Sequence, residues 1–195
     1  MHLPTKSLNL ILQTLDEVRA MINAMDPSEK SQLSAEWLAR LDASTSADPW
    51  THGFSLVHRD SGIVVGKVGF KGPPGADGVV EIAYAVESEH QGKGYATEAA
   101  QALAAYAFSS GQVRIVQAHT LAEPNASTRV LIKCGFRHIG EVIDPEDGVV
   151  WRWEKHHEAD EDAVRTSKMP SSSPALTRLI RPARVRRDER DDSGN

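Results

Sequence analysis

The chain opens with alternating positions, because leucine recurs at every second residue of 8–12. Such alternation predicts a short half-buried strand. Thr14 and Glu17 then form a capping-box pair, which predicts a helix through about Met25. A second helical stretch is predicted from Ser28. It rests on apolar residues at helical spacing, which are Leu33, Trp37, Leu38 and Leu41.

After residue 50 the period of the apolar pattern changes to two. Asp60-Ser61-Gly62 separates two alternating runs and predicts a hairpin turn. The pattern predicts strands over 53–59, 63–70, 79–86, 113–119, 136–143 and 149–155. Helical spacing predicts helices over 93–110 and 126–133. Strands and helices therefore mix along the whole chain, as in an α/β domain.

Composition narrows the class of protein. Hydrophobic residues are 40% and charged residues 25% of the 195 residues, which is typical of one folded soluble domain. The single cysteine, Cys134, leaves no internal disulfide framework. No apolar run reaches transmembrane length, and the N-terminus lacks the apolar core of a secretion signal. We therefore expect a cytoplasmic protein that does not enter a membrane.

The C-terminal part of the chain differs from the rest. Residues 1–155 hold 14 Lys and Arg against 19 Asp and Glu, whereas residues 156–195 hold 8 of each kind. Apolar residues are sparse in the second segment, where Pro, Ser, Arg and Asp dominate. This predicts a folded domain over 1–155 and a disordered mixed-charge tail over 156–195. The acidic body gives no indication of a nucleic-acid partner.

The segment 91–97 is the strongest local signal for chemistry. It follows the predicted strand 79–86 and opens the next helix, with Gly92 and Gly94 on either side of Lys93. The first N–H groups of a helix lack intrahelical partners and carry partial positive charge, and glycines let a ligand approach the backbone. The pattern predicts a phosphate cradle. It lacks the Gly-Lys-Ser/Thr of a P-loop and the third glycine of a dinucleotide fingerprint.

Two motifs resemble those of one known family. Gln91-Gly92-Lys93-Gly94-Tyr95-Ala96 resembles the Gln/Arg-x-x-Gly-x-Gly/Ala signature of the GNAT superfamily of acyl-CoA-dependent N-acetyltransferases. The run Asn125–Phe136 looks like an element of the branch that contains ribosomal-protein N-terminal acetyltransferases. The resemblance covers residues 8–155. It implies the α/β (α+β) GNAT fold, a mixed, mostly antiparallel sheet of six to seven strands with a splayed central strand pair and about four helices.

The resemblance also implies where acetyl-CoA would bind. The donor would lie in an opening between strands 79–86 and 113–119, with its pantetheine arm paired to the backbone of Ala85 and Val86 like an added strand. One of these two N–H groups would stabilise the oxyanion of the reaction. The pyrophosphate would lie near Thr97, on backbone N–H groups of Gln91, Gly92, Lys93, Gly94, Tyr95 and Ala96.

For the transfer itself, the resemblance implies a general base, but this chain lacks the residue that many family members use as general acid. An alkylamine is protonated at neutral pH, so a base or a relay water must take a proton. Glu81 matches a catalytic glutamate of some family members, and its alternative is a solvated strand carboxylate. Leu131 stands where many members have a tyrosine that protonates the departing thiolate. Ser127 near the thiol, Thr128 or water would have to take this role. Ser127 also fits a plain helix N-cap. Asn125 would contact the pantetheine arm.

Three functions follow, and the first is favoured because both motifs are present in order. It is an N-acetyltransferase that moves an acetyl group from acetyl-CoA to a primary amine, on a protein N-terminus or a small molecule, by direct attack in a ternary complex. The two N-terminal helices and the loop before Phe54 would shape its acceptor site. The second is a non-catalytic acyl-CoA-binding sensor or partner-binding module. The third is an RNA- or ribosome-associated module that uses residues 178–190. No metal is expected, and the pattern leaves the oligomeric state open, including a homodimer.

Overall fold

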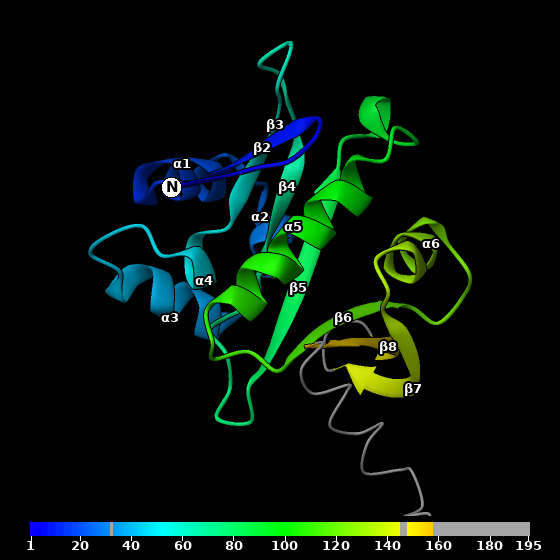
Figure 1. Cartoon of the computed structure of the whole chain (residues 1–195). Coiled ribbons are helices and arrows are strands. Elements are labelled where there is room, and N and C mark those ends of the chain that lie inside the picture. The colour runs from blue at the N-terminus through cyan, green and yellow to red at the C-terminus, as the bar shows by residue number, and fades with distance from the viewer. Residues whose placement is uncertain (32, 145–147, 158–195) are drawn as a thin grey trace, which may run out of the picture.

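The computed structural model describes residues 1–31, 33–144 and 148–157, and within them one sheet of eight strands forms the centre (Figure 1). Neighbouring strands are antiparallel, except that β5 and β6 are parallel. In spatial order the strands are β1 (His2–Pro4), β2 (Leu8–Leu12), β3 (Phe54–His58), β4 (Val64–Phe70), β5 (Val79–Val86), β6 (Ile115–Leu121), β8 (Gly148–His156) and β7 (Arg137–Asp144).

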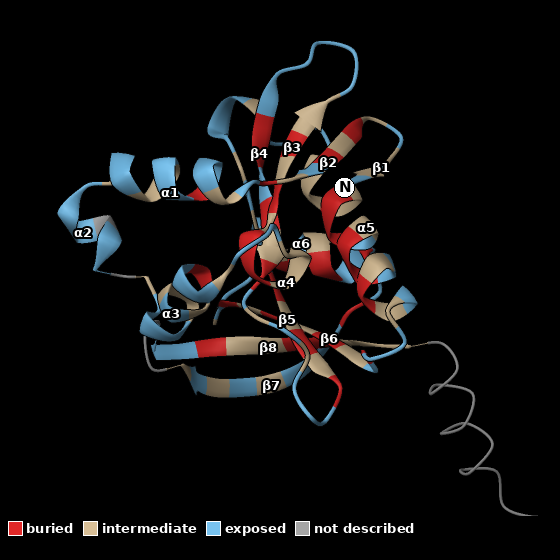
Figure 2. Ribbon diagram, turned by 90° about the vertical axis from the view of Figure 1, so that its left-hand side faces the viewer, coloured by how far each residue is buried: buried red, intermediate tan, exposed pale blue. Residues whose placement is uncertain are grey.

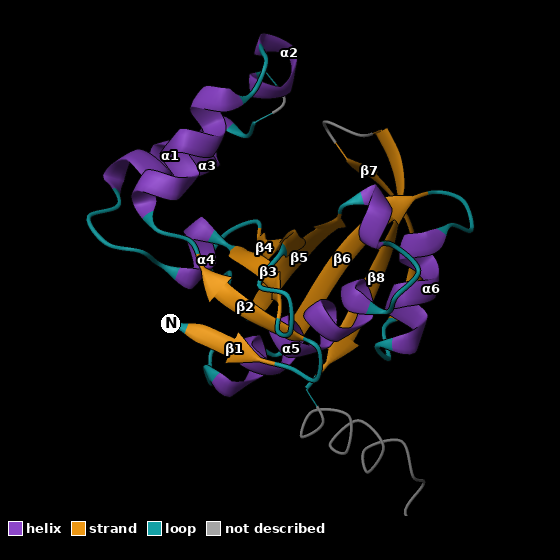
Figure 3. Ribbon diagram, turned by 90° about the horizontal axis from the view of Figure 1, so that it is seen from above, coloured by secondary structure: helices purple, strands orange, loops and turns teal. Residues whose placement is uncertain are grey.

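Helices lie on both sides of this sheet. Seen from above, α1 to α3 stand on one side of strands β2 to β5, and α5 lies on the other (Figure 3). The helices are α1 (Leu15–Ala24), α2 (Pro27–Lys30), α3 (Ala35–Ala43), α4 (Pro49–His52), α5 (Tyr95–Ser109) and α6 (Ala126–Lys133), with a 3₁₀ turn at Ser88–His90. The four longer helices are α1, α3, α5 and α6, which fits the predicted number.

The core lies between α5 and the sheet. α5 packs against β5, β4 and β2, and one side of it is buried from Ala99 to Ala107 (Figure 2). Alanines dominate that side, so the helix can approach the strands closely. Val80 and Ile82 of β5 are buried, whereas Ala83 and Ala85, which follow them, are exposed. Because successive side chains of a strand alternate, β5 has a buried face and an accessible face.

The predicted fold class is confirmed, with three local differences. The sheet has one strand more than predicted, since β1 pairs with β2 through only three residues. The helix predicted from Ser28 is wrong, because the chain leaves α2 after Lys30 and Ser34 starts α3 by accepting a hydrogen bond from the Trp37 N–H. The loop expected before Phe54 contains the single turn α4. The predicted tail 156–195 lies outside the described residues from 158 onward.

Strands β5 and β6 separate after a short contact, as Figure 1 shows. Their parallel pairing has three rungs, of which the last joins Glu81 to Gln117. Beyond this rung β5 continues for five residues along β4 alone. The splayed strand pair is therefore present, and Glu81 lies where the opening begins.

Candidate active site

The turn before α5 leaves its backbone accessible. Gly92 and Gly94 have φ of +75° and +87°, which glycine adopts without strain. A Cβ at either position would meet no heavy atom within 4 Å. Gly94 is the N-cap of α5, and no side-chain hydrogen bond caps this helix start. The helix begins at Tyr95 rather than at the predicted Lys93. Bound phosphate stays a prediction.

The register of β5 against β4 decides which backbone groups face the opening. The Glu87 N–H donates to the Val65 carbonyl at 3.0 Å. In an antiparallel ladder the backbone groups of every second residue point to the same partner strand, so Ala85 also faces β4. Tyr84 and Val86 face the opening instead. The predicted backbone contact of pantetheine therefore fits Val86 and conflicts with the register at Ala85.

Gln91 links the turn to the end of β5. Its Nε2 donates to the Val86 carbonyl at 2.9 Å. The carbonyl is thus engaged within the protein, and the Val86 N–H is the group that the register directs to the opening. This N–H is suited to bind a ligand oxygen, because a backbone donor held by a sheet needs no reorganisation.

Glu81 takes part in a network that joins three segments. Its Oε1 lies 2.9 Å from Lys71 Nζ and 3.0 Å from His119 Nδ1. The Gln117 Nε2 lies 3.4 Å from Oε2. Only 18% of the Glu81 side chain is exposed. The reading of Glu81 as a solvated strand carboxylate is therefore wrong, and its catalytic role stays a prediction.

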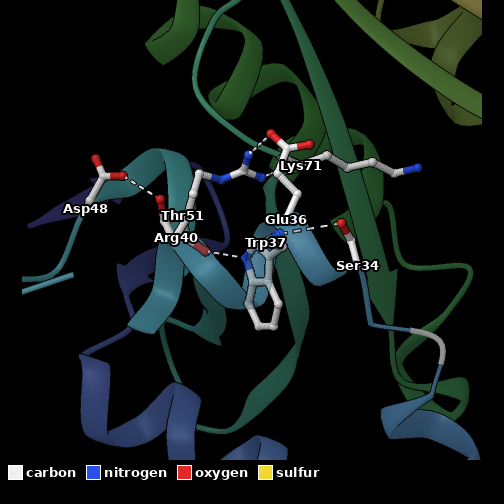
Figure 4. A network of polar contacts seen from close by, with 7 residues as sticks. All are labelled: Ser34, Glu36, Trp37, Arg40, Asp48, Thr51 and Lys71. Atoms are coloured by element: carbon white, nitrogen blue, oxygen red, sulfur yellow. Dashed lines mark hydrogen bonds and ion pairs between the residues drawn. The ribbon is translucent and has the colours of Figure 1, made fainter. Parts of the chain in front are cut away.

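A cavity of about 980 Å³ lies over the accessible face of β4 and β5. Its other walls come from α1, α3, α4 and the loop after Phe70. The N-terminal helices and the segment before Phe54 are predicted to shape the acceptor site, whereas the loop after Phe70 is not. Figure 4 shows how the α3–α4 wall is fixed. The Trp37 Nε1 donates to the Thr51 carbonyl at 2.8 Å, and Arg40 Nη2 donates to the Lys71 carbonyl at 2.8 Å. The Lys71 side chain points away from Arg40, and Glu81 lines the same cavity.

Comparison with known families shows to which family the chain belongs. Residues 8–137, more than half of the chain, match the model of the acetyltransferase (GNAT) domain. The chain belongs to the GNAT acetyltransferase family. The matched residues include β5, the turn at 91–94 and α6, so they contain both halves of the site.

Known GNAT proteins share the fold and part of the sequence. The uncharacterised N-acetyltransferase YjdG of Bacillus subtilis strain 168 is 34% identical over 101 residues, which are 52% of this chain and 58% of YjdG, less than two thirds of that relative. RimL, the ribosomal L7/L12 α-N-protein acetyltransferase in complex with coenzyme A, is 14% identical with a TM-score of 0.61, over 82% of this chain and 100% of RimL. The aminoglycoside acetyltransferase AAC(6′)-Ib, also with coenzyme A, is 19% identical with a TM-score of 0.57, over 81% and 99%.

In this GNAT domain the start of α6 differs from one prediction. Asn125 is the N-cap, because its Oδ1 accepts from the Thr128 N–H at 3.0 Å and its own N–H donates to Thr128 Oγ1 at 3.0 Å. The reading of Ser127 as the N-cap is therefore wrong. The capping bond uses the side-chain oxygen of Asn125. The amide nitrogen of the same side chain is still suited to the predicted pantetheine contact. Ser127 lies in the first turn of α6.

Tyr84 spans the opening and is a residue that the sequence reading missed. Its hydroxyl donates to the Ser127 carbonyl at 3.3 Å, which ties β5 to α6. Burial raises the pKa of Tyr84 to about 12, so the phenol stays protonated at neutral pH. Leu131 is fully buried within α6 and belongs to the core. Tyr84 is therefore the tyrosine that this GNAT domain brings near Ser127.

Two further groups bear on the site. The Cys134 Sγ lies 3.5 Å from the Thr97 carbonyl, between α6 and α5, and burial raises the pKa of this thiol to about 11. Cys134 is thus a protonated, buried side chain, in agreement with the absence of a predicted role. Among the described residues, no three His, Cys, Asp or Glu side chains are grouped to hold a metal ion. Nor does any helix of the described ranges have the length and apolarity needed to cross a membrane.

Proposed function

We propose that this protein is an N-acetyltransferase that moves the acetyl group of acetyl-CoA to a primary amine, on a protein N-terminus or a small molecule. The reaction is direct attack of the amine on the thioester in a ternary complex. The donor arm lies in the opening between β5 and β6, and the amine enters from the cavity over β4 and β5.

The position of Glu81 is the observation that carries this proposal. Its carboxylate lies at the last β5–β6 rung and lines the cavity. The other end of the same strand leads through Val86 to the turn at 91–94. A carboxylate and an anion-binding turn are therefore held on one rigid strand, one on each side of the region where donor and amine would meet. A general base typically contributes about 10²–10⁴-fold to rate.

The donor chemistry follows from the turn. The two open glycines and the uncapped start of α5 suit a pyrophosphate. The Val86 N–H suits the arm or the oxyanion, and Asn125 and Ser127 line the α6 side. The coenzyme A complexes of RimL and AAC(6′)-Ib support this choice of donor at the level of the shared fold.

Thermal unfolding with acetyl-CoA tests donor binding. Ligand at a hundred times its dissociation constant should add about 2.7 kcal/mol to the stability of the wild type. Gly94→Glu should abolish this gain, because its carboxylate would repel the pyrophosphate. Gly62→Glu is the matched control, since Gly62 has a φ of +68° and also meets nothing within 4 Å, but lies in the β3–β4 turn. Equal stabilisation of both variants would contradict the proposal.

Release of free thiol then tests turnover. The acceptors to compare are a tetrapeptide with a free N-terminal alanine, spermidine and kanamycin. RimL acts on a ribosomal-protein α-amine and AAC(6′)-Ib on an aminoglycoside, so the fold alone admits both classes. Binding of acetyl-CoA without turnover on a wide amine panel would favour the non-catalytic alternative, for which the buried Leu131 in place of an acid is the supporting observation.

A further inference from the structure

The two oxygens of the Glu81 carboxylate have different surroundings. Oε1 receives two close donors, Lys71 Nζ at 2.9 Å and His119 Nδ1 at 3.0 Å. Oε2 has one partner among the described residues, the amide of Gln117 at 3.4 Å. A bond of that length is weak. The carboxylate is therefore held through one oxygen, and the second oxygen is left for another proton donor.

Among the described residues, the His119 ring makes one hydrogen bond, and its partner is Glu81. An ionised carboxylate only accepts, so the Nδ1 of His119 carries the proton of this bond. The Nε2 is buried, and no polar atom among the described residues lies within hydrogen-bonding distance of it. A buried polar atom without a partner costs stability. The ring is therefore oriented by Glu81 alone among the polar groups that the structure describes around it.

The three groups come from different strands that meet where the sheet opens. Lys71 follows β4 and is joined to Glu81 by a backbone bond of 3.0 Å from its N–H to the Glu81 carbonyl. His119 lies on β6, two residues after Gln117, the last residue paired with β5. Lys71 and His119 thus hold the carboxylate from both neighbouring strands. These two contacts keep the Glu81 rotamer fixed at the place where the backbone of β5 loses one partner strand.

We infer that Lys71 and His119 are positioning residues that hold Oε1 of Glu81, so that Oε2 is the atom that takes the proton of the acceptor amine. This inference rests on the proposed function. The ammonium of the acceptor gives one proton to Oε2, and the nitrogen lone pair attacks the thioester carbon. The C–N bond forms and the C–S bond breaks with its electron pair on sulfur. The second nitrogen proton ends on the thiolate, and Oε2 releases its proton to water.

Other charged groups surround this network. β8 lies next to β6, with Arg152 opposite His119 and Glu154 opposite Gln117. Arg152 Nε donates to Glu154 Oε1 at 2.9 Å, so these two charges compensate each other. Asp144, Glu36, Arg40 and Lys67 complete the charged groups of the cavity. Lys71 is the cation in direct contact with Glu81. Of these charged groups, its removal should therefore disturb the position of the Glu81 carboxylate most.

Kinetics with the alanyl tetrapeptide test the two positioning residues. His119→Ala should lower kcat about tenfold, and His119→Gln should restore part of it because an amide N–H can donate to Oε1. Lys71→Met should also lower kcat about tenfold while KM for the tetrapeptide stays unchanged, because one of the two close donors to Oε1 is gone. Lys71→Arg should restore part of kcat, since a guanidinium N–H can donate to Oε1. All four variants should keep the stabilisation by acetyl-CoA, which reports folding and donor binding.

Two exposed residues supply matched controls. His2→Gln removes an exposed imidazole of β1, and Lys6→Met removes an exposed lysine of the loop between β1 and β2. Both should keep the wild-type kcat and KM. Wild-type kinetics in His119→Ala and Lys71→Met would overturn the inference while leaving the proposed function intact.

Nitrogen NMR of the histidine rings supplies a readout that needs no activity. His119 of the wild type should be the Nδ1–H tautomer, and Glu81→Ala should release it toward the Nε2–H tautomer. An unchanged tautomer in that variant would overturn the inference even if other variants fail to fold. If the tautomer is as expected but the protein acetylates no amine, the proposed function is contradicted. The role of Lys71 and His119 in catalysis is then contradicted as well.

Discussion

The two sides of the site differ in the groups that they offer to a ligand. The cradle side, which consists of Val86 and residues 91–97, offers backbone N–H groups of a strand end, a glycine turn and a helix start. The cavity side, which consists of Glu81, Lys71, Trp37 and Arg40, offers side chains. The cradle side is continuous in sequence, whereas the cavity side brings together segments that are tens of residues apart.

This difference explains what each half can recognise. Backbone donors at fixed spacing suit a ligand part that does not vary, such as a phosphate group. Side chains from α3, α4 and β4 can change without disturbing the sheet, so they suit an acceptor that differs between relatives. The bonds from Trp37 to Thr51 and from Arg40 to Lys71 show that the wall is nevertheless held in place. We therefore expect variants of the two sides to separate donor binding from turnover.

The largest effect is expected on the cavity side. Glu81→Gln should lower kcat about 100-fold, because the amide keeps the shape of the side chain but cannot take a proton. It should leave the acetyl-CoA-induced thermal shift unchanged. Glu141→Gln on β7 is the control and should match the wild type in both assays. A wild-type kcat in Glu81→Gln would remove Glu81 from the mechanism.

Alkaline stability should depend on two buried groups near the opening, Tyr84 and Cys134. Burial raises the pKa of Tyr84 from 10 to about 12 and that of Cys134 from 9 to about 11. Each raised pKa means that the folded protein holds the proton more tightly, so the stability contribution is complete below the unfolded value and is lost as pH rises through the folded value. Tyr84→Phe should reduce the loss between pH 10 and 12 by about 2 kcal/mol, and Cys134→Ala should act between pH 9 and 11. Denaturant unfolding across pH 8 to 12 measures both. Identical curves would contradict this assignment.

The two capping boxes allow a matched test of the halves. Thr14→Ala on α1 and Asn125→Ala on α6 should each lower the free energy of unfolding by about 1 kcal/mol. Only Asn125→Ala should also weaken acetyl-CoA binding, since α6 borders the opening. Thermal shifts with and without acetyl-CoA distinguish the two. An equal loss of donor binding in both variants would mean that the halves are not independent.

The smallest effect is expected at Trp37. Trp37→Phe keeps an aromatic ring but removes the donor to the Thr51 carbonyl, a bond that typically contributes about 0.5–1.5 kcal/mol. The wall between α3 and α4 should loosen, and KM for the acceptor should rise about threefold with KM for acetyl-CoA unchanged. Steady-state kinetics with both substrates varied gives the two constants. A change confined to acetyl-CoA would place this wall on the wrong side of the site.

Local patterns predicted the elements where a strand or helix carries its own signal. β5 and α6 have the predicted bounds, because alternation marks β5 and helical spacing marks α6. The stretch from Ser28 was harder, since its apolar spacing continues across a break that Ser34 enforces by capping a new helix. The single turn α4 and the three-residue β1 are too short to leave a periodic pattern.

The sequence by itself determined the cradle, because Gly92, Gly94 and the helix start are neighbours and their chemistry belongs to the backbone. It also indicated Glu81 as a carboxylate on the correct strand. Only the tertiary structure decided that Lys71 and His119 bind one oxygen of Glu81, since strand pairing brings them from positions 10 and 38 residues away in the chain. The register likewise decided that Val86 faces the opening and Ala85 faces β4. Both outcomes depend on which strands pair and in which phase, and no local segment contains that information.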